Sequence, residues 1–165
     1  MTAVPYDSMA PHYDAFTAHH DYERWTRELE AAARRHGLSG DRLLDVACGT
    51  GKSFAPWLER GWRVTGCDAS EAMLRVAQDR ARGRATLVCR DMRALGELGE
   101  FDLITCLGDG VNYLLDEADL VDAFVSARAN AAPGAVYLFD VNCLATYRGF
   151  FAATLVAEEP DRLMV

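Results

Sequence analysis

The stretch "LLDVACGTGKS", residues 43–53, decides the fold that this sequence predicts. An apolar run from Leu43 to Ala47 passes directly into Gly49 and Gly51, and a segment with helical spacing follows. A strand that turns through glycines into a helix is typical of the first unit of a parallel α/β sheet, because glycine enters such a turn without steric cost. The stretch therefore predicts a strand, a ligand-binding loop and a helix, in that order.

The rest of the chain alternates between strand and helix patterns. Apolar runs at 42–47, 63–68, 85–91, 101–107 and 135–141 predict strands, and segments at 21–37, 53–61, 70–83 and 117–134 predict helices. Ser70 and Asp116 stand at helix starts as expected caps. The last of these helices carries an apolar stripe made of Leu120, Val121, Phe124 and Val125. Such alternation implies a parallel sheet covered by helices on both faces, in one domain.

Composition narrows the class of protein. The 165 residues are half hydrophobic and carry a formal net charge of −8, and basic residues do not cluster, so we expect no nucleic acid partner. No run approaches the roughly 18 apolar residues that cross a bilayer, and the start shows no leader pattern, so we expect a cytoplasmic chain without membrane contact. The five cysteines show no CxxC spacing, which predicts reduced thiols and no metal site.

Two nucleotide-binding interpretations of the glycine loop meet the sequence only in part. A P-loop ends in Gly-Lys-Ser, as Gly51 to Ser53 does, but its first glycine would stand at Val46. A dinucleotide fingerprint needs a third small residue where Phe54 stands, although an acid, Asp68, follows the second strand as that fingerprint requires. Both an ATP-binding and an NAD(P)-binding α/β protein stay open as alternatives.

A third interpretation uses more of the sequence. Through "LLDVACGTG", "VTGCDASEAML", "CRDM" and "FDLITCLGDGVNYL", taken in this order, the chain resembles the class I S-adenosylmethionine (SAM)-dependent methyltransferases from about Tyr6 to Val165. SAM carries a free ammonium and a sulfonium, so an acid at position 45 ahead of the glycines suits it better than a pyrophosphate. The resemblance implies a Rossmann-like, doubly wound, mostly parallel sheet in the strand order 3-2-1-4-5, with an N-terminal helical lid.

The resemblance also assigns cofactor roles, with S-adenosylhomocysteine as the product. Asp45, Ala47, Gly49 and Gly51 match the motif beneath the methionine part of SAM. Asp68 matches the ribose-binding acid; Ala69, Met73, Asp91 and Met92 match adenine contacts; and Leu107 matches the backbone position beside the sulfonium. Purely structural roles are the alternative to these contacts: Asp91 could be only a helix cap, and Met73 and Met92 could be only core residues. Lys52 is expected to be solvated in the first helical turn, without a ligand role.

The turn after the fourth strand and the N-terminal segment indicate the class of substrate. The turn "LGDG" lacks the Asn/Asp-Pro-Pro-aromatic sequence of enzymes that methylate base nitrogens, and "YDSMAPHYDAF" resembles the tyrosine lid of small-molecule methyltransferases. Tyr6 or Tyr13 would close over the sulfonium. We therefore expect methyl transfer by in-line displacement to an oxygen or nitrogen atom of a natural product or amino-sugar-like molecule. Catalytic candidates are His12, His19, His20, Asp109 and Tyr113, and Asn142 could orient the substrate.

The C-terminal part departs from the family pattern. The resemblance implies two antiparallel strands after the fifth, whereas "ATLVAEEPDRLMV" predicts a hairpin about a Glu-Glu-Pro-Asp turn. We divide the chain into a lid and helix at 1–37, a SAM-binding core at 38–145 and a hairpin at 146–165. The fifth strand would then have an open edge, which favours a homodimer or a complementing chain. A non-catalytic SAM-binding or regulatory module is the alternative to an enzyme.

Overall fold

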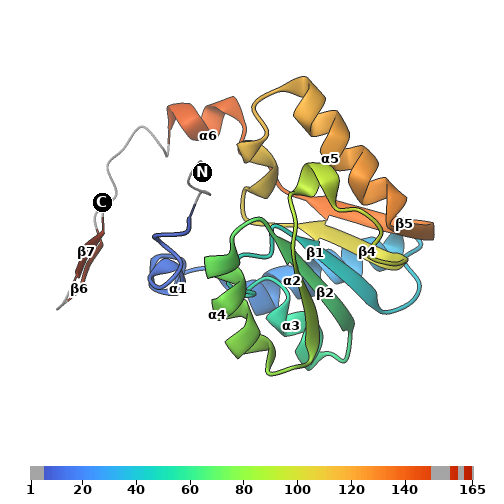
Figure 1. The fold of residues 1–165 in the computed structure, drawn as a ribbon, viewed down its shortest axis with the longest axis horizontal. Helices are drawn as coiled ribbons and strands as arrows, with labels where there is room; N and C mark the ends of the chain where they lie inside the picture. Colours follow the sequence, from blue (N-terminus) through green and yellow to red (C-terminus); the bar gives the residue numbers. More distant parts are fainter. Residues whose placement is uncertain (1–5, 150–156, 160–161, 165) are drawn as a thin grey trace.

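The computed structural model describes residues 6–149, 157–159 and 162–164 (Figure 1). Five parallel strands form one sheet in the order β3-β2-β1-β4-β5, which confirms the predicted Rossmann-like topology. These strands are β1 (Arg42–Val46), β2 (Arg63–Asp68), β3 (Ala85–Cys89), β4 (Phe101–Cys106) and β5 (Ala131–Phe139). The order reverses between β1 and β4, and such a switch point is where open α/β sheets bind ligands beyond the carboxyl ends of the strands.

Helices cover both faces of this sheet. They are α1 (Tyr13–Phe16), α2 (Tyr22–Arg35), α3 (Ala55–Glu59), α4 (Glu71–Ala81), α5 (Glu117–Ala129) and α6 (Leu144–Arg148), with 3₁₀ turns η1 (Met92–Ala94) and η2 (Gly110–Tyr113). None of the helices in the described residues is both long and apolar enough to cross a membrane. In Figure 1, α1 and α6 lie beyond the same end of the sheet.

Successive residues of the central strands pack into two separate hydrophobic cores, one on each face of the sheet. Leu43, Val64 and Leu103 face α2, α3 and α4, where Phe54 and Trp57 are fully buried. Leu44, Val46 and Ile104 face α5 and η1, together with Leu95 and Ala127. Because successive side chains of a strand point to opposite faces, the continuous apolar runs of the sequence serve both layers at once.

The boundary between α5 and β5 differs from the predicted one. The sequence pattern extends the helix to position 134, but α5 ends at Ala129 and β5 begins at Ala131. Buried Asn130 lies at the junction: its side chain bonds Leu98 N, Gly96 O and Ser126 O. The register of β5 against β4 then shifts between Phe101 and Leu103, which leaves room for a proline and a glycine in an edge strand.

The apolar stripe predicted on α5 is buried only in part, because Leu120 packs against the core while two other members of the stripe face solvent. Ala123 and Ala127 are buried, whereas Val121 is 52% and Val125 is 62% exposed. Phe124 packs on Tyr137 and Phe139 of β5, and Phe139 is itself 44% exposed. The β5 side of the molecule therefore presents apolar side chains to solvent.

The two predicted helix caps differ in the structure. Asp116 occupies the N-cap position of α5, but its side chain accepts no capping hydrogen bond, whereas Ser70 caps α4 by accepting from Met73 N.

Two short strands follow the core. They are β6 (Ala157–Glu159) and β7 (Arg162–Met164), and they pair in antiparallel register as a separate two-stranded sheet. The predicted hairpin is therefore present, although Glu158 and Glu159 belong to its first strand and not to its turn. In Figure 1 the pair stands apart from the main sheet.

Candidate functional site

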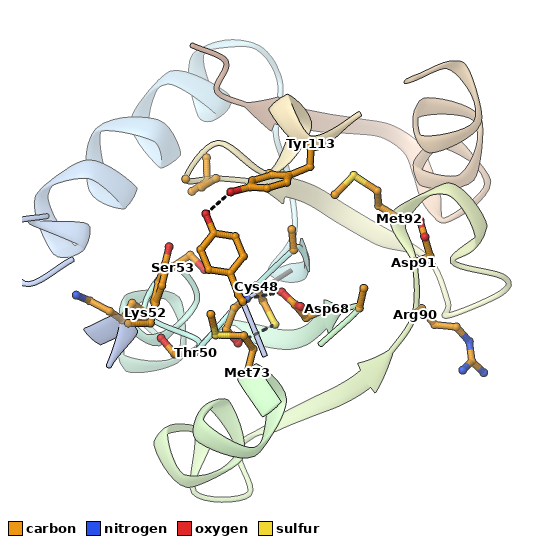
Figure 2. A pocket seen from close by; sticks show the side chains of 18 of the residues that line it. Cys48, Thr50, Lys52, Ser53, Asp68, Met73, Arg90, Asp91, Met92 and Tyr113 are labelled. Carbon is orange, nitrogen blue, oxygen red and sulfur yellow. Dashed lines mark hydrogen bonds between the residues drawn. The ribbon is translucent and has the colours of Figure 1, made fainter. Parts of the chain in front are cut away.

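A cavity of about 270 Å³ lies at the carboxyl ends of the strands, where the strand order reverses. The segments after β1, β3 and β4 line it together with the end of β2, and the N-terminal segment contributes Tyr6 and Tyr13. Figure 2 shows Thr50, Lys52 and Ser53 on one side, Asp91 and Met92 on the other, and Asp68 between them. The side chain of Arg90 points away from this space in the same view.

The loop after β1 has the left-handed backbone that its glycines predict. Ala47 has φ 55°, Gly49 φ 53° and Gly51 φ 81°. Ala47 and Gly49 line the cavity, and a Cβ at Gly49 would meet no atom within 4 Å. Gly51 does not line it; a Cβ there would strike the ring of Phe54 at about 2.4 Å. Gly49 thus shapes the ligand side of the loop, and Gly51 allows the loop to pack on the core.

Asp45 lies below the loop and outside the lining of the cavity. It is buried, and its carboxylate accepts hydrogen bonds from Ser53 Oγ at 2.5 Å and Thr105 Oγ1 at 2.6 Å. Burial raises the pKa of Asp45 to about 6, against the lowering effect of the two hydroxyls. Asp45 thus contacts the lining of the cavity through Ser53.

Asp68, at the end of β2, faces the cavity and fixes the glycine loop. Its carboxylate accepts from Gly49 N and Ser70 N, both at 2.8 Å. Burial raises the pKa of Asp68, and the backbone hydrogen bonds oppose that rise. Two N–H bonds leave further lone pairs on the carboxylate free to accept from a ligand hydroxyl.

The opposite wall is apolar with one acid. Met73 and Met92 line the cavity with Ala69, and Asp91 borders it (Figure 2). Asp91 also caps η1 through Arg93 N at 2.9 Å and pairs with the Arg93 guanidinium. The structural alternative for Asp91, a helix cap, is therefore present alongside its position in the lining.

Four tyrosines line the cavity. Tyr6, Tyr13 and Tyr22 come from the N-terminal part, and Tyr113 comes from η2. The Tyr6 and Tyr113 hydroxyls share a hydrogen bond, drawn in Figure 2, and the Tyr6 ring lies edge-on to both Tyr13 and Tyr113. Burial raises the pKa of Tyr22 to about 12 and also raises those of Tyr13 and Tyr113. All of these phenols stay protonated at neutral pH.

Lys52 is not the solvated helical residue that the sequence suggested. It precedes α3, and its ammonium donates to the Thr17 carbonyl at 2.7 Å and the Thr17 hydroxyl at 2.9 Å. In Figure 2 its side chain runs away from Asp68. Lys52 therefore ties the glycine loop to the N-terminal segment, which a local sequence pattern could not show because Thr17 lies 35 residues away.

The turn after β4 is tied to the residues after β5. Asp140 accepts from Gly108 N at 2.7 Å and Asp109 N at 3.0 Å, and Asp109 has a left-handed φ of 67°. Burial and the adjacent Asp109 raise the pKa of Asp140. Asn142 N donates to Asn112 Oδ1 at 2.9 Å, so Asn142 positions this turn and does not line the cavity.

Most of the predicted cofactor residues meet around the cavity, and most of the catalytic candidates do not. Lining residues that the sequence predicted are Tyr6, Tyr13, Ala47, Gly49, Asp68, Ala69, Met73, Asp91, Met92, Leu107 and Tyr113. Asp45, Gly51, His12, His19, His20 and Asp109 lie outside the lining, and the three histidines are exposed. Tyr22 and Thr50 also line it and were missed; the spacing of Tyr22, at the start of a helix, indicates only a buried face.

Comparisons with known proteins agree with this geometry. The profile of the methyltransferase domain family matches residues 43–134. The protein YqeM of Bacillus subtilis (strain 168) is 36% identical over 140 residues, which cover 83% of this chain and 55% of YqeM. The chain thus spans little more than half the length of that relative.

Solved structures show the same resemblance. The crystal structure of a SAM-dependent methyltransferase from Clostridium acetobutylicum ATCC 824 superposes with a TM-score of 0.80 at 28% identity, over 94% of this chain and 65% of that one. SAM-bound CalS10, an amino pentose methyltransferase from Micromonospora echinaspora involved in calicheamicin biosynthesis, gives 0.72 at 27% identity, over 87% and 58%.

Proposed function

Since the chain belongs to the class I SAM-dependent methyltransferases, through the methyltransferase domain at residues 43–134, we propose that it binds SAM in the cavity at the carboxyl ends of its strands. We propose further that it transfers the methyl group to a nitrogen atom of a small molecule. The observation that carries the proposal is Asp68: it faces the cavity at the end of β2 while holding the open Gly49 turn.

The lining residues fit the parts of SAM. The Asp68 carboxylate would accept from the ribose hydroxyls, and the apolar surface of Ala69, Met73 and Met92 would cover the adenine, with Asp91 at its amino group. The open side of Gly49 leaves space for the methionine part. The ring of Tyr13 would lie beside the sulfonium, which aromatic faces attract. SAM, when bound, supplies an electrophilic methyl group on a cationic sulfur.

The titratable groups of the cavity favour an amine as methyl acceptor. A hydroxyl acceptor needs a base, but no histidine of the described residues lines the cavity, and burial raises the pKa values of Tyr13, Tyr22 and Tyr113. A free amine needs only to arrive unprotonated and aligned for in-line displacement. The similarity to an amino pentose methyltransferase supports an amino-sugar-like acceptor. Tyr6 and Tyr113 would orient it by hydrogen bonds.

The alternative ligands fit less well. A P-loop uses its lysine on phosphate, but the Lys52 ammonium is occupied by Thr17. A dinucleotide site needs a small residue where buried Phe54 packs under Gly51. The absence of a nucleic acid partner and a cytoplasmic location stay predictions from charge and composition.

Calorimetric titration with SAM, S-adenosylhomocysteine, ATP-Mg²⁺ and NAD tests the cofactor. We expect the first two to bind, and Asp68→Asn to weaken them by about tenfold or more, because a charged hydrogen-bond acceptor is lost. Asp122→Asn, an exposed acid of α5 outside the cavity lining, is the matched control and should bind like the wild type. Binding of ATP or NAD alone would reject the proposal. Methylation assays with amino-sugar and hydroxyl acceptors then separate nitrogen from oxygen transfer.

We also propose that the free edge of β5 pairs with another polypeptide segment, from a second copy or a complementing chain. Among the described residues β5 pairs with β4 alone, and Phe139, Val121 and Val125 are exposed beside that edge. Sedimentation of the purified chain tests this: a monomer at all concentrations, with no gain in stability from a complementing segment, would contradict it.

A further inference from the structure

The N-terminal segment is joined to the glycine loop by a charged contact outside the cavity. Asp14 in α1 accepts from the Thr50 hydroxyl at 2.7 Å and from the Arg80 guanidinium. Arg80, near the end of α4, also donates to the Thr50 carbonyl and, at 3.1 Å, to the Thr50 hydroxyl. One guanidinium thus holds three groups from two other parts of the chain.

A second contact lies at the other end of α1. The Lys52 ammonium donates to both oxygens of Thr17, and it lies 5.5 Å from the centre of the Tyr22 ring. Lys52 is the single lysine of the 165 residues. Burial lowers the pKa of Lys52, and the carboxylate of Asp14 opposes that change.

These two contacts fix parts that do line the cavity. Neither Asp14 nor Arg80 lines it, but Tyr13 lies next to Asp14, and Thr50 and Lys52 belong to the loop that forms its floor. The N-terminal segment makes two further contacts across the opening, Tyr6 with Tyr113 and Asp7 with Ser70 Oγ at 2.5 Å. A ligand in the cavity would therefore be covered by a segment held at both ends.

We propose that Asp14, Arg80 and Lys52 are positioning residues that form a latch, which keeps the N-terminal segment closed over the cofactor and slows its dissociation. The inference rests on the proposed SAM site for its functional consequence, but the latch itself is a property of the chain without ligand. Asp14 and Arg80 lie outside the cavity lining and act through Tyr13 and the glycine loop, to which Lys52 belongs.

The chemistry of the latch suits a closure that opens and re-forms. Charge-assisted hydrogen bonds to a planar guanidinium are strong and directional, so the closed position is specific. The Arg80 and Asp14 side chains are 26% and 40% exposed, so water and salt can still reach them.

The single lysine provides a direct reading of the latch in the absence of cofactor. We would acetylate the purified chain with a limiting amine-reactive ester and measure the labelling rate of Lys52 by peptide mass spectrometry. We expect Arg80→Ala to label several-fold faster than the wild type, because a released segment exposes the ammonium. Loss of the Arg80 charge alone would raise the pKa of Lys52 and slow its labelling, so faster labelling reports opening. Arg75→Ala is the matched control, since Arg75 lies on α4 in an exposed pair with Glu71. Equal or slower labelling in Arg80→Ala would overturn the latch.

The second measurement concerns the cofactor. Stopped-flow displacement of S-adenosylhomocysteine should show dissociation faster by about tenfold in Arg80→Ala and Asp14→Asn, with a smaller change in association, because most affinity differences lie in the dissociation rate. Arg75→Ala should match the wild type. Unchanged dissociation in both latch variants would overturn the role in retention. Failure of the wild type to bind SAM or its product would reject the proposed function, and the labelling result would still decide the latch.

Discussion

The cavity end of the sheet and the β5 edge use their side chains in opposite ways. At the cavity end, buried polar groups bond one another: Asp45 with Ser53 and Thr105, and Asp68 with Gly49. At the β5 edge, apolar groups face solvent, as Phe139 and Val125 do. The cavity end is therefore built by contacts within the described chain, whereas the β5 edge presents apolar side chains beside a strand that has one partner among the described residues.

The largest expected effect is a difference in the free energy of unfolding between variants at the cavity end and variants at the β5 edge. Phe54→Ala removes a fully buried ring beneath the glycine loop and should lower the free energy of unfolding by about 3–5 kcal/mol. Phe139→Ala removes the same ring at the β5 edge and should cost less than about 1 kcal/mol, because that ring is 44% exposed. Urea denaturation of both variants measures this, and equal losses would contradict the comparison.

A smaller effect concerns pH and the buried acid of the cavity end. Burial raises the pKa of Asp45 from 3.8 to about 6, so the folded chain binds more protons than the unfolded chain between these values. The contribution of Asp45 to stability is therefore fully present below about pH 4 and is lost as pH rises through about 6, by on the order of 1–3 kcal/mol.

Comparison of the wild type with Asp45→Asn isolates this contribution from those of the other acids. In urea melts between about pH 4.5 and about pH 7.5, a range that spans this titration, the wild type should lose stability relative to the variant. Asp122→Asn, which changes an exposed acid, should run parallel to the wild type. If the stability of Asp45→Asn runs parallel to that of the wild type over this pH range, the pKa of the Asp45 carboxyl is not raised by folding.

The smallest effect on folding is expected at the β5 side. Val125→Lys places a charge at a 62% exposed position and should change the free energy of unfolding by no more than about 0.5 kcal/mol. It should nevertheless weaken any association through this surface, because a charge would be buried there. Sedimentation velocity of the variant measures association, and Arg75→Lys on α4 serves as the surface control. Unchanged association with Val125→Lys would place the interface elsewhere.

Local patterns located the five strands of the sheet, although the fifth begins at Ala131 and not at the predicted position 135, and the resemblance to the methyltransferases supplied most of the cavity lining. The strand at 63–68 was predicted at its observed bounds, and the turn at Gly49 and the acid at Asp68 follow from residue type and position in the chain. Where the predicted end of a helix was wrong, a contact with a distant part of the chain set the observed end. The helix predicted at 117–134 ends at Ala129, where buried Asn130 bonds the segment before β4. Of its apolar stripe, Leu120 and Phe124 pack on the rest of the fold.

The sequence by itself determined the order of strands and helices, the left-handed loop after β1 and the acid at the end of β2, because these depend on side-chain period and on local backbone freedom. Only the tertiary structure decided that Asp68 faces the cavity while Asp45 lies beneath it, and that Lys52 binds Thr17. The same holds for the contact of Asp14 with Arg80, 66 residues apart. The direction of a side chain depends on partners that folding brings from distant parts of the chain, and no local pattern contains them.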